Sequence, residues 1–180
     1  MSQFPGLFVK NVPVPYCVKN ICSISVNESE EIVILDSSYS PSITRISESG
    51  CVLKSIPLNN IVHEPSDFTI HENKYFIIDF KTHSIIGIGD DGGVFLKFTT
   101  ANRFPTGIII DQANCNILVS DQRGCKMNMN VYSARGILQM KFVCQYEQVK
   151  YCTGLKMLAN GNIVTLDKRN NRILEFITLS

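Results

Sequence analysis

The side chains best suited to catalysis or metal binding are few in this chain of 180 residues. All three histidines, His63, His71 and His83, lie in one short stretch, and the seven cysteines include no zinc-binding Cys/His spacing. Motifs for a nucleophilic serine, a phosphate loop or a dinucleotide are absent. Residues 90–93, Asp-Asp-Gly-Gly, fit a hairpin turn better than a calcium loop. The sequence predicts no metal, no cofactor and no catalysis, with cysteines that are mostly buried or half-buried free thiols.

A set of aspartates recurs at a nearly fixed interval. Each member ends a run of apolar, β-prone residues, and successive members are 43, 42 and 46 residues apart. The set consists of Asp36, Asp79, Asp121 and Asp167. These carboxylates could surround a channel and hold a metal, but a position that recurs in every unit is more simply explained by turn geometry. We therefore predict that they accept hydrogen bonds from loop amides.

Glycines mark the same period. Gly6, Gly50, Gly93 and Gly136 are 44, 43 and 43 residues apart, and a lysine follows each by four or five positions. Short β-branched runs and polar turns lie between these markers, and no segment has a sustained helical period. In the third repeat, residues 122–128 are predicted to form a polar loop. Four strands in about 43 residues is the size of one propeller blade. The predicted fold is an all-β propeller of four four-stranded blades, with Gly50, Gly93 and Gly136 in turns and with repeats at about 18–54, 63–98, 103–142 and 151–178.

The two ends of the chain complement each other in this scheme. Residues 6–10, Gly-Leu-Phe-Val-Lys, match the fourth strand of a blade, whereas the last repeat holds only the first three strands. Pairing of the two would close a four-bladed ring and leave no sheet edge unpaired. The alternative is part of a six-bladed propeller with two exposed blade edges.

The third and fourth repeats resemble the NHL repeat. The resemblance lies in residues 104–108, Phe-Pro-Thr-Gly-Ile, with Asp111 and 116–121, and in residues 160–167 followed by 170–173, Asn-Asn-Arg-Ile. It extends more weakly over 18–178, and Cys115 replaces the turn glycine of the third repeat. The resemblance implies a propeller similar to that of TRIM-NHL proteins, which regulate messenger RNAs or ligate ubiquitin and bind RNA or protein on one face. The zinc-binding modules of those ligases need closely spaced Cys and His ligands, which this sequence lacks. Ligase activity would therefore require modules other than this chain.

In a propeller, the loops between second and third strands share one face with the links between blades, and such loops commonly carry function. The second half of the chain is basic there: residues 101–180 hold ten Lys/Arg and five Asp/Glu. Guanidinium groups bind phosphates and aromatic faces stack on bases, which makes RNA one candidate partner and a docking protein the other. The predicted binding residues are Arg103, Arg123, Lys126, Tyr151, Lys168, Arg169 and Arg172.

Composition sets the remaining bounds. Hydrophobic residues make up 44%, charged residues 18%, and the net charge is +1, so no polyanion partner follows from charge alone. No apolar run approaches the about 20 residues that span a bilayer, and no secretory signal is present. We expect a cytoplasmic, non-catalytic module that binds protein or RNA and no membrane. The alternative is a propeller enzyme, a metal-dependent hydrolase or lyase with a site in the central tunnel.

Overall fold

The computed structural model describes residues 11–123, 126–143, 152–167 and 170–176, with the backbone alone at 122, 123, 126, 152 and 153. Every regular element in these residues is a β-strand, and fifteen strands are present. Among the described residues no helix is long and apolar enough to cross a membrane.

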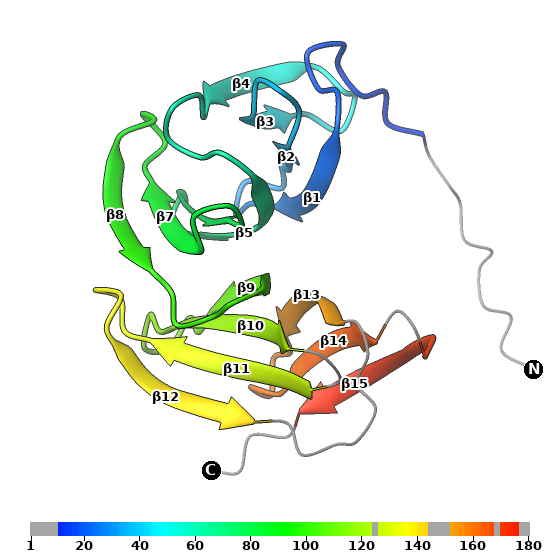
Figure 1. The fold of residues 1–180 in the computed structure, drawn as a ribbon. Helices are drawn as coiled ribbons and strands as arrows, with labels where there is room; N and C mark the ends of the chain where they lie inside the picture. The colour runs from blue at the N-terminus through cyan, green and yellow to red at the C-terminus, as the bar shows by residue number, and fades with distance from the viewer. Residues whose placement is uncertain (1–10, 124–125, 144–151, 168–169, 177–180) are drawn as a thin grey trace, which may run out of the picture.

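The strands form four antiparallel sheets in chain order (Figure 1). The first blade contains β1 (Ile21–Val26), β2 (Ile32–Asp36), β3 (Ser42–Ile46) and β4 (Val52–Pro57). The second contains β5 (Pro65–His71), β6 (Lys74–Asp79), β7 (Ser84–Ile88) and β8 (Val94–Thr99). The third contains β9 (Pro105–Ile110), β10 (Ile117–Arg123), β11 (Lys126–Tyr132) and β12 (Leu138–Val143). The fourth contains β13 (Cys152–Met157), β14 (Ile163–Asp167) and β15 (Arg172–Phe176).

The innermost strands bring the blades together. β1 packs on β5, β5 on β9, and β9 on β13, so the sheets stand side by side around a common centre. The predicted all-β propeller of four blades is therefore confirmed. The predicted strand at 6–10 lies outside the described residues, and the last sheet has three strands within them.

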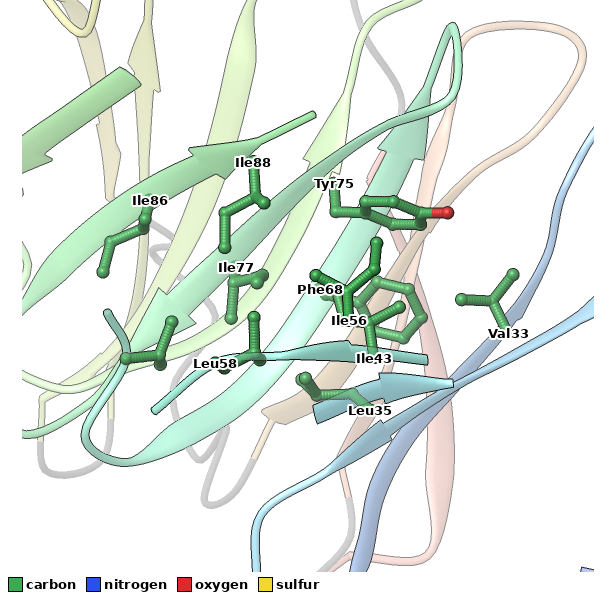
Figure 2. Packing of buried hydrophobic residues seen from close by; sticks show 11 residues of the cluster. Val33, Leu35, Ile43, Ile56, Leu58, Phe68, Tyr75, Ile77, Ile86 and Ile88 are labelled. Carbon is green, nitrogen blue, oxygen red and sulfur yellow. The ribbon is translucent and has the colours of Figure 1, made fainter. Parts of the chain in front are cut away.

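Apolar side chains on both faces of the middle strands hold neighbouring blades together. Because side chains alternate across a strand, Val33 and Leu35 point to the second blade, whereas Ile34 points away from it. At the interface between the first and second blades, Val33 and Leu35 pack against Phe68, Ile77 and Ile86 (Figure 2). Strand β7 is buried along its whole length, since a blade lies on each of its faces. This double burial explains the continuous apolar runs of the sequence.

The outer faces of the first and last blades lack such a neighbour within the described part of the chain. Ile24 and Val26 of β1 expose 59% of their surface each, and on the last blade Leu166 exposes 51% and Ile173 71%. The described blades thus share three packed interfaces.

One predicted loop is wrong. We expected a polar loop over residues 122–128, but β10 runs to Arg123 and β11 begins at Lys126, with Asp121 opposite Asn128 and Arg123 opposite Lys126. Ladder hydrogen bonds between the two strands extend the hairpin through polar residues, since backbone pairing does not require apolar side chains.

Candidate functional site

The recurring aspartates fasten the links between blades to the ends of the second strands. The side chains of Asp36 and Asp79 are fully buried, and each carboxylate accepts hydrogen bonds from two consecutive link amides. The donors lie 2.7–3.2 Å away and are Lys19 N and Asn20 N for Asp36, His63 N and Glu64 N for Asp79, and Arg103 N and Phe104 N for Asp121. Each carboxylate therefore fixes where the chain enters the inner strand of its own blade.

These hydrogen bonds also set the ionisation of the carboxylates. Burial alone would raise the pKa of Asp36, but the backbone amides of Lys19, Ser38 and Asn20 outweigh it and lower that pKa. The pKa of Asp79 is likewise lowered against the effect of burial, chiefly by hydrogen bonds from the side chain and amide of His63. No cluster of three or more His, Cys, Asp or Glu that could hold a metal occurs among the described residues.

The fourth aspartate has side-chain donors. Asp167 Oδ2 accepts Asn170 Nδ2 at 2.7 Å and Arg172 Nε at 3.0 Å. Arg172, one of the predicted binding residues, thus forms an ion pair with a buried carboxylate at the end of β14.

A central cavity of about 740 Å³ lies where the inner strands of all four blades meet, and loop-face residues such as Ser37 and Phe80 border it. Asp67 of β5 joins three blades there: its Oδ1 accepts Ser23 Oγ of β1 at 2.7 Å, and its Oδ2 accepts Ile108 N of β9 at 3.1 Å. Burial raises the pKa of Asp67, and the hydrogen bonds from Ser23 and Ile108 oppose this rise, with a smaller effect from the nearby Lys156 of β13. Both carboxylate oxygens thus serve the contacts between blades.

An aromatic cluster stands beside this cavity on the loop face, and we call Phe80, His83, Arg103 and Phe104 the Phe80–Phe104 cluster. The ring centroids of Phe80 and Phe104 are 6.4 Å apart, and those of Phe80 and His83 are 6.3 Å apart. The guanidinium carbon of Arg103 lies 6.0 Å from the centre of the Phe104 ring. Phe104 remains 42% exposed, so the cluster offers apolar surface and a positive charge to solvent.

Backbone hydrogen bonds hold the two phenylalanines of the cluster in place. Phe104 N donates to Asp121 at 2.7 Å, and Phe80 N donates to the Glu64 carbonyl at 2.8 Å. These bonds attach the Phe104 link to the end of β10 and the loop after β6 to the link that precedes β5. The recurring aspartates thus position the candidate site without taking part in it.

The structure brings together only part of the predicted binding set. Arg103 belongs to the Phe80–Phe104 cluster, and Arg172 pairs with Asp167. Arg123 and Lys126 face each other across the β10–β11 hairpin, where only their backbone is described. The other predicted members, Tyr151, Lys168 and Arg169, lie outside the described residues. Sequence reasoning missed Phe80 and Phe104 as site residues, although Phe80 directly follows the recurring Asp79 and Phe104 directly follows Arg103.

The turn glycines occupy the left-handed region at two of the three predicted positions. Gly50 has a φ of +85° and Gly136 of +78°. In the second repeat the left-handed residue is Gly92, with a φ of +84°, and Gly93 follows it, donating its amide to Asp91 Oδ1 at 2.9 Å.

The fold and this loop face define the protein as a β-propeller. No protein-family model matches the chain. No curated protein matches it either. Several solved structures are similar to it in fold. A protein of unknown function from Bacteroides caccae is 11% identical, with a TM-score of 0.71 over 86% of this chain and 62% of that one. Virginiamycin B lyase from Staphylococcus aureus is 15% identical, with a TM-score of 0.62 over 85% and 54%.

A chain of a nidogen–laminin complex is 17% identical, with a TM-score of 0.62 over 86% of this chain and 64% of that one. The chain therefore spans about half to two thirds of the length of these three proteins. At such identities the likeness shows the fold alone.

Proposed function

We propose that this chain is a non-catalytic recognition module that binds a protein partner through the loop face of the propeller. The Phe80–Phe104 cluster carries the proposal. Aromatic and arginine side chains dominate the binding energy of protein interfaces, and here they stand together, partly exposed, beside a central hollow.

Two features of the loop face support this role. The link that carries Arg103 and Phe104 is fastened by the buried carboxylate of Asp121, so binding would order little additional backbone there and would keep most of its interaction energy. Tyr39, in the loop between β2 and β3, is fully exposed on the same face and adds a second aromatic contact point.

The likeness to the nidogen–laminin chain and the resemblance to NHL repeats agree with a partner-binding propeller. The proposed module resembles the substrate-binding propeller of TRIM-NHL proteins, and we place its action in the cytoplasm.

The test starts with capture of partners from a cell extract on the purified protein and on two variants, Arg103→Ala and Phe104→Ala. The controls are Lys97→Ala and Phe142→Ala, which remove the same kinds of side chain from exposed positions on the outer strands β8 and β12. A protein retained by the wild type and both controls is then purified, and its Kd is measured by calorimetry. We expect Phe104→Ala to weaken binding by about 30-fold, the effect of one central anchor.

Equal affinity of Phe104→Ala and Phe142→Ala would refute the loop-face site. The same samples are treated with ribonuclease before capture and are titrated with a pool of single-stranded RNA. Captured material that is RNA, with an affinity that falls steeply with salt, would replace the protein partner by an RNA partner.

A further inference from the structure

A thiol, an imidazole and an amide meet at the face of the propeller opposite the loop face. Cys115 lies in the turn between β9 and β10, and His71 ends β5 in the neighbouring blade. Cys115 Sγ is 3.5 Å from His71 Nε2, within the range of a sulfur hydrogen bond, and His71 Nδ1 is 2.6 Å from Gln112 Oε1. The three side chains come from two blades, and the contact spans 44 residues of sequence.

The direction of these hydrogen bonds follows from the amide. Gln112 Oε1 can only accept, so His71 Nδ1 must carry the hydrogen and donate it. In the neutral ring Nε2 is then the acceptor, and Cys115 donates its S–H to that nitrogen. The imidazole is thus oriented to take the thiol proton.

A carboxylate lies near the ring nitrogen that would receive the thiol proton. Glu72 Oε1 lies 3.9 Å from His71 Nε2, and Glu72 Oε2 is held at 3.2 Å by Lys74 Nζ. The imidazole itself is only 12% exposed, whereas Cys115 is half-buried on a surface turn. Glu72 thus lies on the side of the ring that faces the thiol, and the sulfur stays within reach of a small molecule.

The backbone at Cys115 is in the left-handed region, with a φ of +58°. The corresponding residue of the fourth repeat is Gly161, with a φ of +84°, in the matching Asn-Gly-Asn-Ile segment. A side chain in this region is less favourable than glycine, because its Cβ crowds the following carbonyl oxygen. The third repeat bears this cost and gains a thiol that touches the histidine of the neighbouring blade.

The cysteines with described side chains differ in their surroundings. Three of the four, Cys17, Cys22 and Cys51, are exposed, contrary to the expectation of mostly buried or half-buried thiols. Cys51 has a serine hydroxyl at 3.5 Å, whereas Cys115 has an imidazole. The environment of Cys115 is the one suited to nucleophilic attack.

We propose that Cys115 is a modification site that reacts with small disulfides of the glutathione class, with His71 as the proton acceptor and Gln112 as the residue that fixes its tautomer. Acyl transfer would need free amides to bind an oxyanion, but Cys115 N donates to the Asp111 carbonyl and Asn116 N to Asn114 Oδ1. Exchange with a disulfide needs no such donors.

The step balances in atoms and electrons. The Cys115 proton moves to His71 Nε2, and the thiolate attacks one sulfur of the disulfide. A new S–S bond forms while the old one breaks, so Cys115 is oxidised and one half of the reagent is reduced. The leaving thiolate takes the proton from His71, and the products are a protein mixed disulfide and one free small thiol.

The test measures mixed-disulfide formation at each cysteine of the folded, fully reduced chain in oxidised glutathione. Samples are quenched with an alkylating reagent and digested, and the peptides are quantified by mass spectrometry. We expect Cys115 to react at least about tenfold faster than Cys17 and Cys51, a modest part of the 10²–10⁴-fold that a positioned base contributes. His71→Ala should remove this advantage, and added imidazole should restore it at Cys115 relative to Cys17.

A second variant keeps the proposal testable if His71→Ala fails to fold. Gln112 is exposed, so Gln112→Leu should preserve the fold while releasing the tautomer, and we expect it to slow Cys115 several-fold. Cys115 reacting no faster than Cys17 in the wild type would overturn the proposal, as would an unchanged Cys115 rate in Gln112→Leu. Neither result bears on the loop face.

Discussion

The buried carboxylate of Asp79 offers the sharpest test of how the blades are held. Its two oxygens accept the amides of His63 and Glu64, and His63 Nδ1 lies 3.0 Å away. A hydrogen bond to a charged acceptor contributes about 1.5–3 kcal/mol, but the link lies at the surface and water can replace part of what is lost. We expect Asp79→Ala to lower the free energy of unfolding by about 2–4 kcal/mol, and Asp79→Asn, which keeps one acceptor, by about 1–2 kcal/mol.

The assay is urea denaturation followed by circular dichroism, with the slope of the transition checked for constancy. Asp91→Ala is the matched control, because that exposed carboxylate accepts the nearby Gly93 amide at 2.9 Å, a contact within one turn, and its loss should cost less than about 1 kcal/mol. A loss in Asp79→Ala as small as that in Asp91→Ala would refute the role given to the recurring aspartates.

The same carboxylates predict a dependence of stability on pH. The pKa values of Asp36 and Asp79 are lower in the folded chain than their ordinary value of about 3.9. Their contribution is therefore complete above that value and is lost as the pH falls through the lower, folded pKa. The urea midpoint should drop below about pH 4, and Asp79→Asn should show a shallower drop. Identical acid profiles would contradict this assignment.

Two further substitutions test the packing between blades. Gly136→Ala should destabilise the chain by about 2–3 kcal/mol, because a Cβ there would lie 2.4 Å from the Phe98 ring in a left-handed turn, whereas Gly154→Ala, with φ +66° and open space, should cost about 1 kcal/mol. Equal thermal shifts would exclude the clash. Tyr132→Phe should cost about 1–3 kcal/mol in chemical denaturation, since the buried hydroxyl donates to Asn102 Oδ1 at 2.7 Å; a cost near zero would show that this bond adds nothing.

The predictions that succeeded depend on local chemistry. A hairpin forms from neighbouring residues, so the β-branched runs and the glycine turns such as Gly136 identified the strands and their period. The same reasoning failed at residues 122–128, where polar side chains indicated a loop but the backbone ladder of β10 and β11 continues.

The candidate site was less accessible to sequence reasoning. Positive charge in the loops pointed to Arg103 but equally to Arg172, and charge alone cannot show that Arg172 pairs with the buried Asp167. Phe80 and Phe104 lie 24 positions apart in the printed sequence, so their 6.4 Å approach depends on how two blades pack.

The sequence by itself determined the repeat, the strands within it and the aspartate that ends each second strand, because these arise within one blade. The tertiary structure decided which side chains meet between blades. Such partners lie about one period apart in sequence: Ser23 with Asp67 at 44 residues, Arg45 with Asp90 at 45, and His71 with Cys115 at 44. A contact of that kind depends on the rotation and spacing of whole sheets, which are set by the sum of the packing in the core and not by any short run of residues.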